Sequence, residues 1–349
     1  MTKLMKHRLF WPMFSLVALI ALNTAVRPQF MKITVRDGDF YGALIDILRN
    51  SAPLMLVALG MTLVIATRGI DLSVGAVMAV SGAVTLTIID GSSSPGSTST
   101  VLVAMLVGIG VAMVLGLWNG FLVAVLQIQP IIATLVLMMA GRGVALLITD
   151  GFITTVNSEP LNYVSSGYLF ALPFAFFIWV AVAVAVAVVE RRTALGVLTE
   201  AVGINPEASR LAGVRSRGII LGAYVASGTL AGVAGILYAS NIRAADANAA
   251  GDLIELYAIL AVVLGGTSLM GGKFTIAGTV IGVLIIQTLE STILFLGVSS
   301  AESPVFFAAV VIIVVLIQSP RVHRAGRSLT RGLRSRGTAE VRSDAEVAA

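Results

Sequence analysis

Residues 63–77 read LVIATRGIDLSVGAV, with an arginine, an aspartate and two glycines set between two apolar runs. What such an interruption means depends on the solvent around the chain. The 349 residues are 57% hydrophobic and 12% charged, with a mean hydropathy of +0.98. Soluble domains carry about 25% charged residues. So few charges cannot cover a soluble surface of this size, which predicts an integral membrane protein.

About ten apolar segments have the composition of membrane-spanning helices. The Leu, Ala, Val and Gly blends lack the alternation of a membrane barrel, so the predicted class is an all-α polytopic membrane protein. Several segments are shorter than the ~20 residues of a simple spanning helix, among them 74–90, 254–264 and 304–318. The ten are 10–26, 48–67, 74–90, 101–126, 131–149, 168–189, 217–240, 254–264, 275–297 and 304–318.

The first segment allows two interpretations. Basic residues before an apolar run are also typical of a cleaved signal peptide. No small-residue cleavage site follows, and Arg27 and Pro28 end the run, so a retained helix is favoured.

The distribution of positive charge predicts the orientation. With a cytoplasmic N-terminus and ten crossings, 17 of the 23 Lys and Arg residues fall on the inner side. The positive-inside rule then places both termini in the cytoplasm. The expected organisation is a cytoplasmic segment 1–9, a transmembrane domain 10–320 and a basic cytoplasmic tail 321–349. The tail is expected to be disordered and to touch anionic lipid.

The segment 190–218 is the longest and most charged inner connection. Within it, Asn205 and Pro206 form a plausible helix cap and first-turn pair. It is the only inner loop large enough to offer a partner protein a docking surface.

Several kinds of chemistry are excluded. There is no cysteine, which excludes disulfides and cysteine-ligated metals. The two histidines, His7 and His323, lie in the terminal segments, which excludes a histidine-based catalytic site inside the membrane. The stretch GTSLMGGKF (266–274) lacks the spacing of a phosphate-binding loop, because Phe274 follows Lys273. The chain is therefore predicted not to be an enzyme, and any ATP that drives it must be hydrolysed by a partner. No cofactor, metal site or nucleic-acid partner is expected.

Ionisable residues are nearly absent from the middles of the spans, and Arg142 and Glu290 are the candidates. No proton relay is recognisable. Arg142, between two glycines, is interpreted as a structural tie to a carbonyl or carboxylate. Polar residues that could line a solute path, or equally bond a neighbouring helix, are Asp71, Asn119, Thr134, Gln287 and Ser291.

The stretch RGIDLSVG (68–75) is best explained as a broken or re-entrant connection in which Asp71 or Ser73 caps the next helix. The competing interpretation is a gate beside the substrate. The segment 260–278 has a similar apolar–glycine–apolar build. Paired interruptions on the inner side suggest an inverted repeat with the path between its halves.

Three GxxxG pairs lie inside apolar segments: Gly116–Gly120, Gly228–Gly232 and Gly278–Gly282. Small residues at this spacing allow helix backbones to approach closely. Tight packing inside one bundle is favoured over a dimer face.

Four segments carry a family resemblance: GMTLVIATRGIDLSVGAVMAVSGAV (60–84), GLWNGFLVAVLQIQPIIATLVLMMAGRGVA (116–145), EAVGINPEASRLAGV (200–214) and YAILAVVLGGTSLMGGKFTIAGTVIG (257–282). Together they resemble the membrane permease subunit of bacterial ABC sugar importers of the ribose type. Within that group, IRAADANAAG (242–251) and AGRGVALLIT (140–149) are most similar to the galactofuranose-transporting members.

The resemblance implies a type II importer fold in a bacterial inner membrane and the uptake of galactofuranose, ribose or a related monosaccharide. It implies cytoplasmic ABC ATPase subunits, a second permease copy or related permease subunit, and a periplasmic sugar-binding protein as partners. Two alternatives remain: a branched-chain amino-acid importer permease, and a stand-alone channel or secondary transporter.

By the same resemblance, residues 200–213 correspond to the element that inserts into the ATPase. The residues implied for this coupling are Glu200, Ala201, Gly203, Asn205, Ala208 and Gly213. Two positions depart from the family pattern. Arg68 stands where many relatives have glycine, and Tyr257 stands where the galactofuranose type tends to have aspartate.

Overall fold

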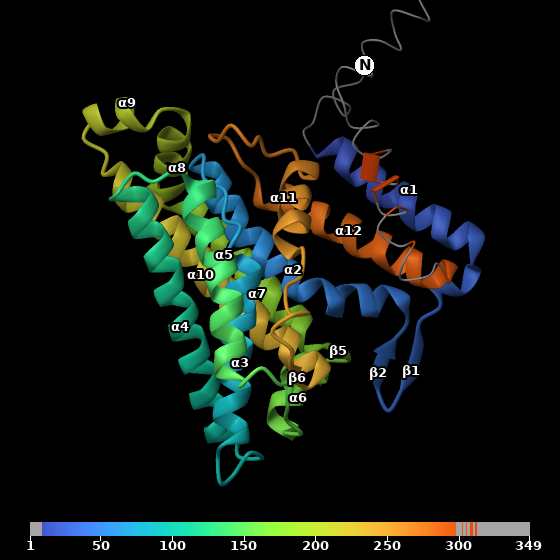
Figure 1. The fold of residues 1–349 in the computed structure, drawn as a ribbon. Helices are drawn as coiled ribbons and strands as arrows, with labels where there is room; N and C mark the ends of the chain where they lie inside the picture. Colours follow the sequence, from blue (N-terminus) through green and yellow to red (C-terminus); the bar gives the residue numbers. More distant parts are fainter. Residues whose placement is uncertain (1–8, 298–301, 303–304, 306–307, 310, 313–349) are drawn as a thin grey trace, which may run out of the picture.

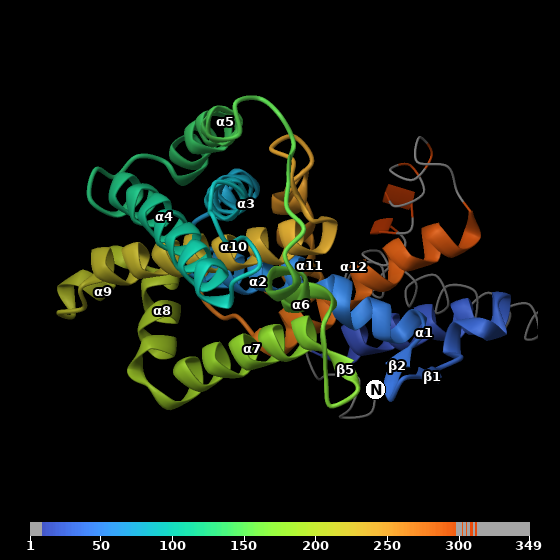
Figure 2. The same ribbon diagram turned by 90° about the horizontal axis from the view of Figure 1, so that it is seen from below.

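The computed structural model describes residues 9–297, 302, 305, 308–309 and 311–312. Within these residues the chain forms twelve α-helices and a short 3-10 helix at Pro28–Met31. Figure 1 shows α3, α4 and α10 running alongside one another, with α1 and α12 packed together at one flank, and Figure 2 shows α7 apart from α3 and α4. The long helices are α2 (Ala43–Ala66), α4 (Thr98–Ala124), α5 (Pro130–Ile148), α7 (Phe174–Arg192), α10 (Ser216–Ile242) and α12 (Ile276–Leu296). The shorter ones are α1 (Phe10–Val26), α3 (Val74–Asp90), α6 (Glu159–Ser166), α8 (Ala194–Ile204), α9 (Pro206–Leu211) and α11 (Ile254–Leu264).

Helices cover nine of the ten predicted spans, and most of the tenth, 304–318, lies outside the described residues. The six long helices have the length and composition needed to cross a membrane. The class of an all-α polytopic membrane protein is therefore confirmed. The count of ten crossings stays a prediction, because α11 has 11 residues and α1 and α3 have 17 each.

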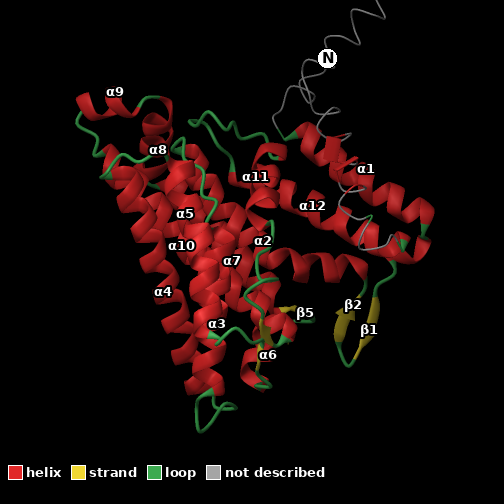
Figure 3. Cartoon of the chain, viewed as in Figure 1, coloured by secondary structure: helices red, strands yellow, loops and turns green. Residues whose placement is uncertain are grey.

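One predicted span began too early. Residues 168–173 form a small antiparallel hairpin of β4 (Tyr168–Leu169) and β5 (Leu172–Pro173), and α7 begins only at Phe174. Phe170 and Ala171 adopt positive φ in the turn, which the apolar character of these residues did not indicate. Two more two-stranded pieces occur in the described connections (Figure 3): β1 (Thr34–Arg36) with β2 (Asp39–Tyr41), and β3 (Thr154–Thr155) with β6 (Ala244–Ala245).

The centre of the bundle is α10, which packs against α2, α3 and α4. Its contact with α4 uses two of the predicted GxxxG pairs. A Cβ atom placed on Gly228 would lie 2.7 Å from the Cα of Gly116, so the two backbones touch. This confirms that these glycines serve tight packing within the bundle.

The outer helices present apolar side chains outward. In the most hydrophobic 18-residue stretch of each helix, only 11% of the residues of α7 and 28% of those of α4 and α5 are buried, against 72% for α2. Leu106 on α4 and Leu147 on α5 are 68% and 78% exposed. Lipid is the solvent that such a surface requires, so α2 is an interior helix and α4, α5 and α7 form the lipid-facing wall.

The helix α2 changes direction along its length (Figure 1). Pro53 inside it has no N–H group and its ring crowds the preceding turn, which bends a helix. The carbonyl of Leu48, in that turn, accepts hydrogen bonds from the indole of Trp179 (3.0 Å) and the hydroxyl of Ser51 (3.0 Å). The bend sets the first part of α2 apart from the bundle axis.

Candidate functional site: two helix breaks, a coupling loop and a polar cavity

The first helix break, residues 67–73, joins α2 to α3 around a buried carboxylate. Asp71 is 1% exposed. It accepts hydrogen bonds from the Ser73 backbone N–H (3.1 Å), the Ser73 hydroxyl (2.6 Å) and the Ser227 hydroxyl of α10 (2.9 Å). Ionised acceptors make strong hydrogen bonds, and a buried carboxylate requires them.

Two more predicted path residues join this network. Asn119 of α4 donates to the Ser73 hydroxyl at 2.8 Å. Thr134 of α5 donates to the carbonyls of Pro130 (2.9 Å) and Ile70 (3.3 Å). Asp71, Asn119 and Thr134 are thus brought together, in hydrogen bonds that fix the break.

The predicted capping is wrong in one respect. Ser73 is the N-cap residue of α3, yet neither its hydroxyl nor the Asp71 carboxylate makes a side-chain cap bond to the first turn. The Ser73 hydroxyl donates to Asp71 instead. The sequence pattern could not show this, because the competing acceptor is fixed by the contact with α10.

The second break, residues 265–275, lies against the first. The Gly272 N–H donates to the Ala66 carbonyl at 3.0 Å, and Arg68 Nε donates to the Met270 carbonyl at 3.0 Å. The Thr62 and Thr279 hydroxyls, on the helices that flank the breaks, are 2.7 Å apart. The two interruptions predicted from the sequence therefore meet in space, whereas the inverted repeat stays a prediction.

The segment 190–218, here called the coupling loop after its predicted role, contacts both breaks. Arg68 Nη2 donates to the carbonyl of Ile204, the last residue of α8, at 2.6 Å. Gly203 packs so closely against the Ala66 carbonyl and the Gly272 amide that a Cβ atom has no room. The six predicted coupling residues lie on this unit, with Glu200, Ala201 and Gly203 on α8, Asn205 between the helices, Ala208 on α9 and Gly213 after it.

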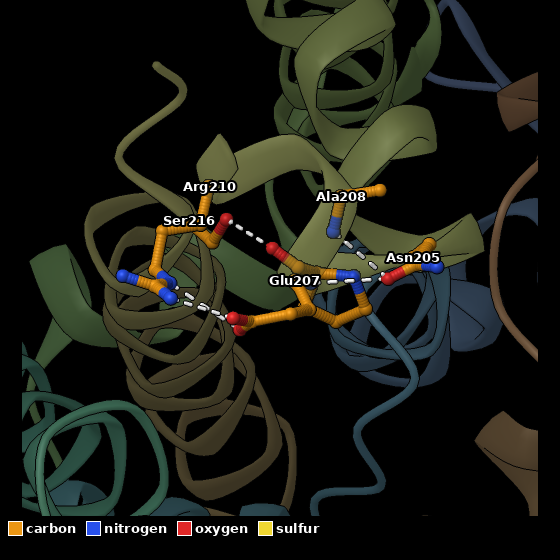
Figure 4. A network of polar contacts seen from close by, with 6 residues as sticks. Asn205, Glu207, Ala208, Arg210 and Ser216 are labelled. Atoms are coloured by element: carbon orange, nitrogen blue, oxygen red, sulfur yellow. Dashed lines mark hydrogen bonds and ion pairs between the residues drawn. The ribbon is translucent and has the colours of Figure 1, made fainter. Parts of the chain in front are cut away.

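The tip of the coupling loop is a short, well-capped helix (Figure 4). The Asn205 side chain accepts from the N–H groups of Glu207 (3.1 Å) and Ala208 (3.0 Å), which confirms the predicted cap. The Ser216 hydroxyl donates to the Pro206 carbonyl at 2.9 Å and ties α9 to α10. Leu211, at the end of α9, is 78% exposed.

An ion pair lies on the exposed side of α9. Arg210 Nη2 and Glu207 Oε1 are 2.6 Å apart (Figure 4). The hydrogen bond from Arg210 lowers the pKa of Glu207, and the same bond raises the pKa of Arg210. Both groups are therefore charged at neutral pH, and Ala208 and Leu211 of the same helix are also exposed.

A cavity of about 420 Å³, here called the α2–α12 cavity, lies at the bend of α2. It is lined by residues of α2, α10, α11, α12 and the loop before α11. Its polar side chains are Asn50, Tyr238, Asp252, Tyr257, Gln287 and Glu290.

The α2–α12 cavity contains one of the five predicted path residues. Gln287 is 6% exposed and donates to Glu290 Oε2 at 3.0 Å. Ser291 lies on the same helix but is not among the lining residues. The sequence showed Glu290 as an ionisable residue within a span, but it was not predicted to line the path. Pro53 was the feature that could have indicated the cavity, because the bend that it causes in α2 lies beside Glu290.

Arg142 holds the loop that closes one side of the α2–α12 cavity. Its Nη1 donates to the carbonyl of Ala247 at 2.8 Å and to the carbonyl of Ala250. The predicted structural tie is therefore confirmed, with backbone carbonyls as partners. Asp246 stabilises the same loop by accepting from the N–H groups of Asn248 (2.9 Å) and Ala249 (3.1 Å).

A lipid-facing helical wall around a buried polar network, with an exposed charged loop at one end, defines a polytopic membrane protein. The family model of permease components of branched-chain amino acid transport systems matches residues 43–316. The chain belongs to this permease family. It is the transport component of an ABC transporter and not its catalytic subunit.

Three relatives align along nearly the whole chain. The galactofuranose transporter permease of Escherichia coli K12 is 47% identical over 95% of this chain and 96% of its own length. The fructose import permease of Bifidobacterium longum is 39% identical over 94% and 92%. The ribose import permease of Escherichia coli K12 is 36% identical over 88% and 93%. No solved structure matches the chain.

Proposed function

We propose that this permease carries a monosaccharide into a bacterial cell, driven by separate ATPase subunits. The observation that carries the proposal is the 47% identity to a galactofuranose permease over 95% of the chain. Relatives named for fructose and ribose also align over most of their length. Galactofuranose, ribose or a related sugar is therefore the expected substrate.

The partners follow from this role. An importer permease without a nucleotide-binding loop requires cytoplasmic ATPase subunits, a second permease copy or related subunit, and a periplasmic sugar-binding protein. The proposed ATPase docking surface is the exposed tip formed by α8 and α9, and the proposed orientation places this tip and both termini in the cytoplasm. Support comes from the basic residues of 190–218 and from the exposure of Leu211.

A series of contacts supports the transfer of force from the proposed docking surface to the membrane core. Arg68 and Gly203 join the end of α8 to both helix breaks, and the breaks connect α2 to α3 and α11 to α12. A displacement of α8 by the ATPase would therefore act on four helix ends at once. Gating by the two breaks is the proposed consequence.

The test is uptake by the complete complex in proteoliposomes. The permease, the ATPase subunits and the cognate binding protein are supplied with ATP and radiolabelled D-galactose, D-ribose, D-fructose or L-leucine. ATP-dependent uptake of at least one sugar is expected. Uptake by the permease alone would instead identify a channel or secondary transporter.

The second candidate is a branched-chain amino-acid permease, which the description of the matching family favours. It predicts uptake of leucine and of no sugar in the same assay. That result would overturn the proposed substrate class while leaving the ATP-driven permease in place.

A further inference from the structure

We propose that the α2–α12 cavity is a binding subsite for an uncharged monosaccharide, and that Asp252 and Glu290 exclude anionic ligands from it. The inference rests on the proposed function, since it names where the sugar binds and which sugars are refused. It concerns a cavity that the hydrogen-bond network of the helix breaks does not use.

The size and lining of the cavity fit a sugar. Its volume of about 420 Å³ lies within the roughly 300–1,000 Å³ of small-molecule sites. Asn50 and Gln287 offer amides that both donate and accept, as a hydroxyl requires. Tyr238 and Tyr257 offer aromatic rings with polar tips, and Pro53, Ile286 and Ile293 are among the apolar residues beside them.

Glu290 is placed to accept sugar hydroxyls. A carboxylate has about four acceptor positions, and Gln287 Nε2 uses one of them at 3.0 Å. Hydrogen bonds to an ionised acceptor are stronger than neutral ones. Glu290 is exposed and lies within α12, a helix long and apolar enough to cross the membrane. A charge facing lipid at such a place is unfavourable, so an aqueous cavity with a polar occupant accounts for it.

The same carboxylates make the cavity unsuitable for an anion. Asp252 and Glu290 contribute two acidic groups, and the lining residues that the structure describes include no lysine, arginine or histidine. Arg142 lies beside the loop before α11, where its guanidinium is already bonded to backbone carbonyls. The free N–H groups that a helix N-terminus usually offers an anion are largely used at the start of α11. The N–H groups of Ile254, Leu256 and Tyr257 already donate to the carbonyls of Gly251 and Leu253. A sugar carboxylate, a sugar phosphate or the carboxylate of an amino acid would therefore meet repulsion without a cationic partner.

Thiol labelling tests the inference directly, because the chain has no cysteine. A single cysteine is placed in the cavity by I254C, and a matched control outside it by S94C in the loop before α4. Both are studied in the complete complex in nanodiscs, with cationic and anionic methanethiosulfonate reagents. D-galactose, D-ribose and D-fructose are the neutral probes, and D-galacturonate is the anionic probe.

At least one neutral sugar is expected to slow the labelling of I254C about fivefold or more, and to leave S94C unchanged. D-galacturonate is expected to protect neither. The cationic reagent should modify I254C faster than the anionic one. The changes E290Q and D252N together should reduce the ratio of cationic to anionic labelling rates about tenfold, and should weaken protection by sugar about tenfold. The control D90N, which removes a carboxylate at the end of α3, should change neither quantity.

Three results overturn the inference. Uptake of a sugar that does not protect I254C would remove the subsite and leave the proposed function standing. Equal protection by D-galactose and D-galacturonate would remove the exclusion of anions. Absence of any sugar uptake would overturn both the subsite and the proposed substrate. The protection assay needs no carboxylate variant, so it decides the matter even where E290Q does not fold.

Discussion

The side chain of Arg68 joins segments that are far apart in the sequence. Its guanidinium donates to the carbonyls of Met270 at 3.0 Å and Ile204 at 2.6 Å. Its backbone has φ +65°, in the left-handed region that favours glycine and costs other residues about 1 kcal/mol or more. The guanidinium has five N–H donors in a rigid plane, and here it connects the coupling loop to both breaks.

The change R68G tests the side-chain hydrogen bonds of Arg68 separately from its backbone conformation. Glycine adopts φ +65° without strain, so folding and co-purification with the ATPase are expected to be retained. Loss of both hydrogen bonds is expected to reduce the stimulation of ATP hydrolysis by sugar-loaded binding protein about fivefold or more. R68K should restore part of the stimulation. Unchanged stimulation in R68G, measured in proteoliposomes, would exclude a role for Arg68 in coupling.

At the scale of elements, the bundle depends on helix backbones in direct contact. A Cβ on Gly228 of α10 would meet Gly116 Cα at 2.7 Å and the Ala112 carbonyl at 2.8 Å. Both are backbone atoms of α4, which cannot move without displacing the helix. Gly222, on the same helix, has no heavy atom within 4 Å of the corresponding position.

These two glycines form a matched pair for a stability measurement. G228A is expected to lower the free energy of unfolding by about 1–3 kcal/mol through overpacking. G222A is expected to be neutral, or to stabilise the helix by up to about 1 kcal/mol through helix propensity. Thermal unfolding in detergent, followed by fluorescence-detected size exclusion, measures both. Similar melting temperatures for the two variants would contradict the packing argument.

The helix α9 is the element expected to bind the ATPase. L211D should weaken co-purification with the ATPase about tenfold, because an exposed leucine at the docking tip is replaced by a charge. F170D changes an equally exposed residue in the β4–β5 turn and should have no effect. Equal losses in both variants would remove Leu211 from the docking surface.

The ion pair on α9 gives a pH prediction with a definite sign. Since the pKa of Glu207 is lowered by Arg210, the contribution of the pair is present above the ordinary pKa of glutamate and is lost as pH falls through the lowered value. ATPase co-purification is therefore expected to be the same at pH 6 and pH 8. A pH dependence in this range that disappears in E207Q would show that Glu207 titrates higher than its bond to Arg210 allows.

At the scale of the whole molecule, both helix breaks and the α8–α9 tip lie at the same end of the bundle, seen at the top of Figure 1. Figure 2 views the molecule from the opposite end. The proposed orientation assigns this end to the cytoplasm, where the basic residues of 190–218 satisfy the positive-inside rule. An ATPase docked on this tip, as proposed, would act on the breaks through α8 without entering the membrane.

Cysteine labelling of spheroplasts checks this orientation. S94C, in the loop between α3 and α4, is expected to react with a membrane-impermeant maleimide from outside. R210C on α9 should react only after permeabilisation. Labelling of R210C in intact spheroplasts would reverse the orientation and remove the ATPase from its proposed site.

Sequence reasoning located both breaks and the Asn205 cap because glycine, proline and cap residues act within a few positions of themselves. The bounds of α11 at Ile254–Leu264 and of α3 at Val74–Asp90 coincide with the predicted segments. It did not separate Asp71 from Gln287, since both are polar residues in apolar surroundings. Their different positions, in a bonded network and in a cavity, depend on which helices face them.

The sequence by itself determined the membrane class, the helical state and the sites of interruption. The apolar composition shows that lipid surrounds most of the chain. In lipid each span must satisfy its own backbone hydrogen bonds, which is a local requirement. Only the tertiary structure decided that residues 67–73 touch residues 265–275, that Arg68 reaches Ile204, and that the bend of α2 leaves a cavity beside Glu290. These contacts join positions separated by more than a hundred residues, and they exist only when α10 and its neighbours pack.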